Sequence, residues 1–271
     1  MTAISIDGPA AEFRQSCMRH LSRSVLAAVP AVIVFTVACS AAAQNPCKFT
    51  AGSTATVADV RDGRTVLLAD GRELRLAAIE ITDDSRSSLQ SLVGGRDIWL
   101  EPTGSEPDRY GRVVAFIFTD DRGQSVQQKM LEQGQARVSA RVGEKACADA
   151  LLTAERAARG ARRGLWTDPN FAPLPSENPG RIAGARGQFA LVEGKVLSVR
   201  ESGATIYLNF GTRWTRDFTV TIPKRHRRDF ATAGVDPKRL EGQRIRVRGW
   251  VEQRVGPVIE AAAPEQIEFG E

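Results

Sequence analysis

Short runs of apolar and β-branched residues alternate with polar residues over the first half of the chain, and turns that contain glycine separate them. The pattern predicts strands at residues 54–60, 65–68, 74–79, 97–101 and 112–118. Helical spacing predicts helices at residues 85–93, 124–133 and 144–159, each followed by a glycine. Asp62-Gly63 and Asp70-Gly71 are hairpin-turn signals, because glycine accepts a positive φ. This order of elements predicts a small curved barrel with helices at its edge.

The last third of the chain predicts a second group of strands. They cover residues 190–199, 205–210, 217–222, 244–251 and 258–262, with a short helix at 225–233 after the third. Five strands with a helix between the third and fourth is the order of an OB fold. Residues 169–186 are rich in proline and predict a semi-stiff linker. We therefore expect a mainly β protein with helices, in which a small barrel domain (44–168) precedes a smaller OB-like β domain (187–271).

The first 43 residues are typical of an export signal. Arg19 and Arg23 precede an apolar stretch at residues 25–38, and Ala41-Ala42-Ala43 offers small residues for cleavage before Gln44. We expect residues 1–43 to be removed and the mature chain to be exported, to the periplasm or the outside medium, without contact to the membrane.

Two alternatives for this segment stay open. A retained membrane anchor is one, although the stretch is short for a span and contains Pro30. A lipoprotein site at Cys39 is the other, and Met18 would begin a signal of more usual length.

Removal of the signal leaves two cysteines, Cys47 and Cys147. In an oxidising compartment such a pair is more often bridged than free, so we expect a disulfide between the start of the first domain and its last helix. Two unpaired thiols are the alternative.

The composition is that of a globular protein. The 271 residues are 42% hydrophobic and 25% charged, which excludes a fibrous or wholly disordered chain. Residues 44–180 hold 18 Lys and Arg against 19 Asp and Glu, whereas residues 181–271 hold 16 against 11. The excess positive charge of the mature chain therefore lies in its last third.

Arginines and carboxylates recur at strand ends in the first domain. Arg75, Glu80 and Asp83 follow one another closely, and Arg112 ends the run Asp108-Arg109-Tyr110-Gly111-Arg112. Two guanidinium groups can neutralise charge on phosphoryl oxygens, one carboxylate can orient a hydrolytic water, and another can hold a divalent cation. These residue types predict chemistry on a phosphodiester.

The motifs that carry these residues resemble the thermonuclease, or staphylococcal-nuclease-like, family. The segments 60–66, 74–83, 108–117 and Gly164-Leu165-Trp166 follow the order and spacing of that family, and the similarity covers residues 53–168. The resemblance implies an OB-type barrel with helices and a calcium-dependent phosphodiesterase that acts on DNA and RNA.

The resemblance also implies roles for single residues. Arg75 and Arg112 match the two catalytic arginines of the family, and Asp83 matches the carboxylate proposed as general base. Glu80 falls where the family has a metal-binding aspartate, and Tyr110 matches a tyrosine near the phosphate of the bound nucleotide.

Other positions depart from the family pattern. Arg64 falls on another metal-binding aspartate, and Ala140 and Val142 stand at two aromatic positions that contact the nucleotide. Calcium takes six to eight oxygen ligands, and a like charge at about 4 Å costs about 4 kcal/mol per elementary charge at an effective dielectric of about 20. We therefore expect calcium-dependent hydrolysis to be weak or absent.

Two interpretations of Arg64 follow from this exchange. In the first interpretation, a metal-free anion pocket is formed by Arg64, Arg75 and Arg112, and Arg64 helps to bind the phosphate. In the other, Arg64 caps an exposed hairpin and points into solvent.

Aromatic residues and arginines interleave in the second domain. They include Arg213, Trp214, Arg244, Arg246 and Arg248, with Tyr207, Arg216 and Trp250 nearby. OB folds hold single-stranded nucleic acid with basic grooves and stacking aromatics, so we expect nucleic-acid contacts here. The alternative is a polar, solvated outer face of the alternating strand at residues 244–251.

The sequence therefore predicts an exported thermonuclease-like protein that binds nucleic-acid phosphates, DNA or RNA, with weakened or lost hydrolysis and no certain cofactor. One alternative is an active calcium-dependent endonuclease, in which Glu80 helps to hold the metal. The other is a non-catalytic scaffold in the cell envelope with a protein partner.

Overall fold

The computed structural model describes residue 47 and residues 52–82, 85–119, 123–143 and 145–270. The expected signal segment, residues 1–43, lies outside these ranges, as does Asp83. None of the helices in the described part of the chain combines the length and apolar character needed to cross a bilayer.

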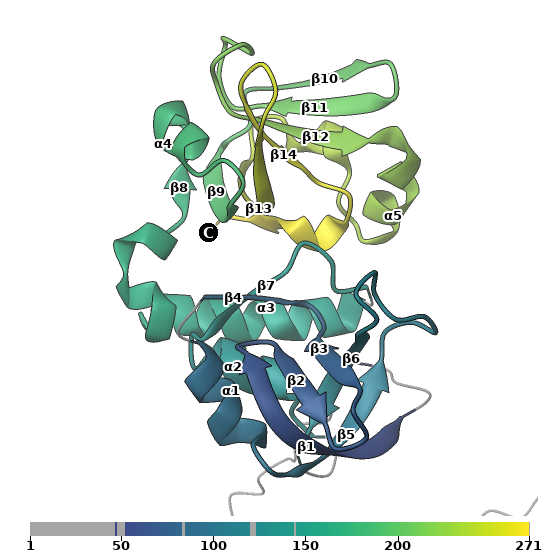
Figure 1. Ribbon diagram of the computed structural model, residues 1–271. Coiled ribbons are helices and arrows are strands. Elements are labelled where there is room, and N and C mark those ends of the chain that lie inside the picture. Colours follow the sequence, from purple (N-terminus) through teal and green to yellow (C-terminus); the bar gives the residue numbers. More distant parts are fainter. Residues whose placement is uncertain (1–46, 48–51, 83–84, 120–122, 144, 271) are drawn as a thin grey trace, which may run out of the picture. The chain divides into compact units, whose positions relative to one another are not determined.

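The first half of the chain closes into a barrel of short strands (Figure 1). Its members are β1 (Ser53–Asp62), β2 (Thr65–Leu68), β3 (Glu73–Leu76), β5 (Asp97–Pro102) and β6 (Val113–Phe118). They pair in the order β1-β2-β3-β6-β5, and β3 and β6 run parallel. Leu74, Leu100 and Phe118 are among the side chains buried inside. The OB-type barrel that the sequence predicts is confirmed.

The strand predicted at residues 74–79 is two strands. Ala78 has a φ of 63°, and this left-handed residue ends β3 and turns the chain into β4 (Ile79–Ile81). Strand β4 leaves the barrel and pairs antiparallel with β7 (Ala136–Val138), which the sequence pattern did not reveal. The turn at Ala78 therefore separates Glu80 on β4 from Arg75 on β3.

The helices of the first half are close to their predicted positions. They are α1 (Ser85–Val93), α2 (Val126–Glu132), α3 (Lys145–Gly160) and the short η1 (Gly164–Thr167). Gly134 follows α2 with a φ of 68°, and a Cβ there would lie 2.1 Å from the carbonyl oxygen of Arg163. Only glycine fits this close approach of two backbones. At the start of α3, Cys147 is joined to Cys47, so the expected disulfide is present.

The proline-rich segment after residue 168 is folded rather than extended. It contains η2 (Pro169–Phe171), β8 (Leu174–Pro175) and α4 (Pro179–Gly184). Strand β8 pairs parallel with the first strand of the second sheet, so this segment packs against that sheet.

The second half of the chain forms another sheet around its own apolar core (Figure 1). Its strands are β9 (Phe189–Lys195), β10 (Ser198–Ser202), β11 (Thr205–Asn209), β12 (Thr219–Pro223), β13 (Arg244–Gln253), β14 (Pro257–Glu260) and β15 (Ile267–Phe269). Its short helices are η3 (Lys224–His226), α5 (Arg227–Thr232), η4 (Pro237–Leu240) and η5 (Pro264–Gln266).

The pairing order of this sheet repeats that of the barrel. The sequence predicts a single strand at residues 190–199, whereas the structure has two there, β9 and β10. Strand β9 pairs with β13, and β10 pairs with β11. The order continues as β11-β12-β14-β13, and β12 and β14 run parallel as β3 and β6 do. Residues 187–271 thus contain a further β sheet, and the OB-like domain there stays a prediction.

Candidate functional site

Arg75 and Arg112 are brought to one edge of the barrel by two parallel strands. Arg75 on β3 lies opposite Val114 on β6, and Arg112 stands two residues before Val114. Because side chains alternate along a strand, residues two apart project to the same face, so Arg112 and Arg75 are diagonal neighbours. The two arginines that the sequence singles out therefore lie together.

Arg75 lies among charged groups of both signs. Partial burial and then repulsion from Arg64 and Arg112 lower the pKa of the Arg75 guanidinium from its usual range. Glu80 and Asp108 act in the opposite direction but are outweighed. Arg64, Arg75 and Arg112 thus form one arginine cluster, and an arginine remains charged at neutral pH even when its pKa falls.

Arg64 is bound to Glu80. Nη1 of Arg64 lies 2.5 Å from Oε2 of Glu80. The Arg64 side chain is only 21% exposed and that of Glu80 only 15%. The same nitrogen donates a longer hydrogen bond, 3.4 Å, to the carbonyl oxygen of Ile79. The interpretation in which Arg64 points into solvent is therefore wrong, since its head group is held against the carboxylate that the family resemblance assigns to a metal.

Arg112 is bound by Asp108 within one tight turn. Nε and Nη2 of Arg112 donate to Oδ2 of Asp108 at 2.9 and 2.7 Å, and the Asp108 carboxylate also accepts from the backbone N–H of Tyr110 and Arg112. The hydrogen bond from the Arg112 side chain is the main cause that lowers the pKa of Asp108 to about 2. Gly111, with a φ of 79°, closes the turn.

Tyr110 projects from this turn and is 64% exposed. The guanidinium groups of Arg109 and Arg112 lie 4.8 and 4.9 Å from the centre of its ring. The ring is thereby held beside Arg112 by cation–π contacts. The ring of Tyr110 therefore lies next to the arginine cluster.

Arg75 differs from its neighbours, because among the described residues it has no ion-pair partner. Its guanidinium is half-buried beside two other cations. The arginine cluster therefore has one member whose hydrogen-bonding capacity is not used by the described side chains.

The described residues do not fit a calcium site. Glu80 is engaged by Arg64, and over the part of the chain that the structure describes no group of three or more His, Cys, Asp or Glu could hold a metal ion. A calcium ion needs several oxygen ligands, and here a guanidinium occupies the one predicted ligand that is described.

Arg137 is a further cation near Glu80 that sequence reasoning missed. It lies opposite Glu80 in the β4–β7 pair. Burial lowers the pKa of Arg137, and the charges of Glu155 and Glu80 oppose this shift. Nη1 of Arg137 donates to the carbonyl oxygen of Phe189 at 2.7 Å. Because β7 has only three residues, the sequence offered no strand pattern that would have paired Arg137 with Glu80.

Glu80 also borders a cavity of about 340 Å³ that reaches the second sheet. Ala140, Trp250 and Glu260 are among the residues that line it. Trp250 is 49% exposed, and its ring meets Phe189 edge-on at 6.0 Å. Ala140 and Val142 are half-buried, and the backbone N–H of Val142 donates to Glu265 at 2.8 Å.

The residues predicted to bind nucleic acid in the second half do not form one surface. Arg213 and Trp214 are exposed in the connection between β11 and β12. Arg244 and Arg246 lie on β13, which β14 separates from β12 in the sheet, and both form ion pairs with Glu193.

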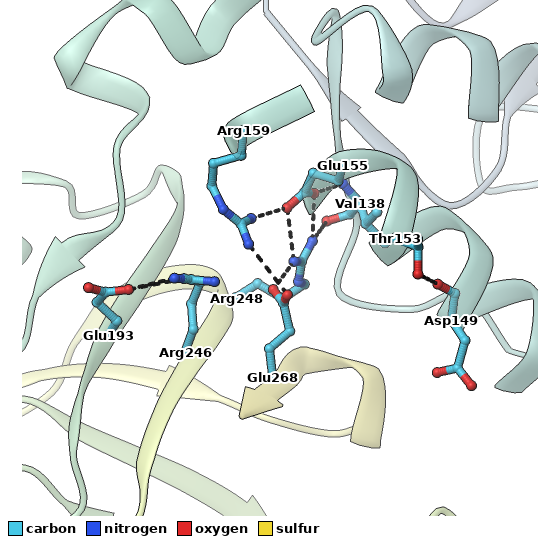
Figure 2. Close-up of polar contacts among 9 residues, drawn as sticks. All are labelled: Val138, Asp149, Thr153, Glu155, Arg159, Glu193, Arg246, Arg248 and Glu268. Atoms are coloured by element: carbon cyan, nitrogen blue, oxygen red, sulfur yellow. Dashed lines mark hydrogen bonds and ion pairs between the residues drawn. The ribbon is translucent and has the colours of Figure 1, made fainter. Parts of the chain in front are cut away.

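Arg248 is not on a nucleic-acid surface at all, and that prediction is wrong. Its side chain is fully buried, and its guanidinium bonds both oxygens of Glu155 on α3, at 2.8 and 3.0 Å, and the carboxylate of Glu268 (Figure 2). It also donates to the carbonyl oxygen of Val138 at 3.0 Å. Although burial opposes the charge, the two carboxylates raise the pKa of Arg248.

Arg159 completes this buried cluster of two arginines and two glutamates. Its Nη1 lies 2.8 Å from Oε1 of Glu155, and its Nη2 lies 3.5 Å from Oε2 of Glu268. The charges balance, which a buried set of ions requires. Arg248 therefore joins β13 to helix α3 instead of facing a ligand.

An OB-type barrel with an arginine cluster at one edge is an arrangement that can bind an anion. The family model described as staphylococcal nuclease homologue matches residues 72–168. This match supports a thermonuclease-like family for residues 72–168 and a nuclease-like function that includes binding of nucleic acid. The match includes Arg75 and Arg112 and begins after Arg64. No curated protein matches the sequence significantly.

Proposed function

We propose that the barrel holds a phosphate group of a nucleic acid in a metal-free arginine site, and that calcium-dependent phosphodiester hydrolysis is weak or absent. Arg75 and Arg112 bind the phosphate, and Arg64 supplies the positive charge that a cation would supply in the family. The single observation that carries this proposal is the ion pair between Arg64 and Glu80.

Electrostatics opposes a metal at this place. A calcium ion bound to Glu80 would have to displace the guanidinium of Arg64 and then remain close to it. At an effective dielectric of about 20, two unit charges at 4 Å repel by about 4 kcal/mol, and a dication doubles this cost. That penalty is large enough to abolish a weak site, whereas the same positive charge favours a phosphate.

Arg75 is the residue best placed to bind the phosphate. Its fork of N–H donors is not engaged by any described carboxylate, and Arg64 and Arg112 raise the positive potential around it. Guanidinium groups match phosphate oxygens with two parallel hydrogen bonds. Arg112 is already bound to Asp108, so it contributes charge and its remaining donors.

An active phosphodiesterase is the second candidate. The observation in its favour is that Arg75 lies on β3 and Arg112 directly precedes β6, and these two strands are paired in parallel. In that case Asp83 would orient the water and Glu80 would hold a calcium ion after release from Arg64. Digestion of single-stranded DNA and RNA with calcium and with a chelator separates the two candidates.

Binding of a labelled oligonucleotide tests the proposal. Fluorescence anisotropy in a chelator is expected to show binding that Arg75→Ala weakens by about tenfold or more, because charged hydrogen bonds to the phosphate are lost. The slope of affinity against salt should fall by about 0.7 for the lost contact to a single strand. Arg72→Ala is the matched control, since Arg72 is an exposed barrel arginine paired with Asp70. An equal effect of both variants would contradict the proposal.

Export of the chain is part of the proposal. The disulfide between Cys47 and Cys147 supports an oxidising compartment, such as the periplasm or the outside medium. Mass spectrometry of the protein from cells is expected to give an N-terminus near Gln44. A chain that retains residues 1–43 would contradict cleavage of the signal.

A further inference from the structure

A groove of about 230 Å³ lies on the outer face of the second sheet. Residues of β11, β12 and β14 form its floor, and the connection before β12 and the turn before β14 form its walls. The lining residues that matter for the argument are Tyr207, Asn209, Trp214, Thr219, Thr221 and Val258.

The floor of the groove is polar because of strand alternation. On β11, Ile206 and Leu208 point into the core, so Tyr207 and Asn209 point outward. On β12, Thr219 and Thr221 alternate with core residues in the same way. Tyr207 lies directly opposite Thr221, so a ring and a hydroxyl stand side by side on the floor.

Thr221 gives the groove an unused hydrogen-bonding group. Its side chain is 3% exposed, and its hydroxyl has no hydrogen-bond partner among the described residues. A buried hydroxyl without a partner costs free energy, which a ligand in the groove can recover by bonding to it.

Trp214 provides a large aromatic surface at the wall. Trp214 is 66% exposed. Its backbone is nevertheless closely packed against Gly256: a side chain added at Gly256 would place its Cβ 3.3 Å from the carbonyl oxygen of Trp214. A hydrogen bond also fixes the loop at residues 213–217: the backbone N–H of Arg213 donates to the carboxylate of Asp217 at 2.8 Å. An exposed indole on a fixed backbone is a surface on which a planar ring can stack.

The rim of the groove carries arginines. Arg254 lines the groove and is ion-paired with Glu252 and Glu260, and three further arginines lie beside the lining residues. Arg213 and Arg216 flank Trp214, and Arg200 on β10 lies opposite Tyr207. All three are exposed, and within the described part of the chain none has an ion-pair partner. Positive charge around stacking rings favours a polyanion with planar bases over a neutral sugar chain.

We propose that this groove binds an unpaired base of single-stranded nucleic acid. The base stacks on Trp214 and Tyr207 and hydrogen-bonds to Thr221, while the arginines of the rim contact the flanking phosphates. The site is separate from the arginine cluster of the barrel and does not depend on the proposed function of that cluster.

Tryptophan fluorescence and anisotropy with short oligothymidylate test the proposal, and an abasic strand of equal length serves as the probe without bases. Every protein in this test is the full chain that also carries Arg75→Ala. Phosphate binding at the barrel is thereby removed, and the measured binding reports the groove alone. Trp214→Ala is expected to weaken binding of oligothymidylate by about 5- to 150-fold, the range for one stacked base, and to leave the abasic strand unaffected.

Two matched variants sharpen the test. Trp214→Phe keeps a ring, so binding should persist while the fluorescence change upon binding is lost. Trp250→Ala removes another exposed tryptophan that lies outside the groove, and it should leave binding unchanged.

Thr221→Val distinguishes a binding role from a structural one. The variant keeps the shape but removes the unpartnered hydroxyl, so stability should be equal or higher while oligothymidylate binds several-fold more weakly. Equal affinity for the abasic and the thymidine strand would overturn the proposal. Fluorescence quenching by a neutral oligosaccharide of N-acetylglucosamine, but not by the oligonucleotide, would also overturn it.

Discussion

The guanidinium of Arg64 lies 2.5 Å from the carboxylate of Glu80, and both side chains are largely shielded from solvent. This ion pair places a cation of the protein against the carboxylate that the family resemblance assigns to a metal ion. Arg64 and Arg112 both act on Arg75, so three arginines of the barrel lie around this ion pair.

The ion pair between Asp108 and Arg112 predicts a pH-dependent contribution to stability. The pKa of Asp108 falls from its usual 3.8 to about 2 in the folded state, so its contribution is complete above about pH 4 and is lost as the pH falls to about 2. Asp108→Asn should therefore be less stable than the unchanged protein at pH 6. Urea unfolding is expected to show this difference shrinking as the pH approaches 2, and a difference that is the same at both pH values would contradict the assignment.

Arg248 predicts a large loss of stability. Arg248→Met leaves Glu155 and Glu268 buried without their main partner, and removal of one member of a buried ion pair costs about 3–5 kcal/mol. Urea unfolding measures the free energy directly. Arg244→Met on the same strand is the control, because its side chain is 55% exposed and its loss should change stability by about 0.5 kcal/mol or less. Equal effects would mean that Arg248 is not buried as described.

The disulfide predicts a measurable constraint on the unfolded chain. It closes a loop with a sequence separation of 100, for which the chain-entropy model gives about 4–5 kcal/mol. Replacing Cys47 and Cys147 together by serine should lower the free energy of unfolding by about this amount. Thiol titration of the denatured mature protein should find neither cysteine reactive, and two reactive thiols per chain would refute the bridge.

The barrel could be predicted from sequence because its signals are local. Alternating strands and Asp-Gly turns recur at short intervals, and the arginines lie in motifs of a known family. The break at Ala78 could not be predicted, since alanine gives no sign of the left-handed φ that splits β3 from β4. For the same reason the β4–β7 pair, which places Arg137 opposite Glu80, was missed.

The error at Arg248 has a different physical origin. An arginine that alternates with apolar residues fits a solvent-facing strand, and it equally fits a strand that faces buried carboxylates. Its partner Glu155 lies 93 residues away on α3, so only the tertiary structure decides between the two. The unpartnered hydroxyl of Thr221 is also a tertiary feature, because a threonine on a strand looks ordinary in sequence.

The calcium response of the protein and of its Arg64→Asp variant tests the central claim most directly. Titration calorimetry and digestion of single-stranded DNA are performed with calcium and with a chelator, and Arg75→Ala excludes a contaminating nuclease. The unchanged protein is expected to bind no calcium and to show no calcium-dependent cleavage, whereas Arg64→Asp should gain calcium affinity, because it places a carboxylate beside Glu80 and removes the competing cation. Vigorous calcium-dependent cleavage by the unchanged protein, lost in Arg75→Ala, would contradict the account.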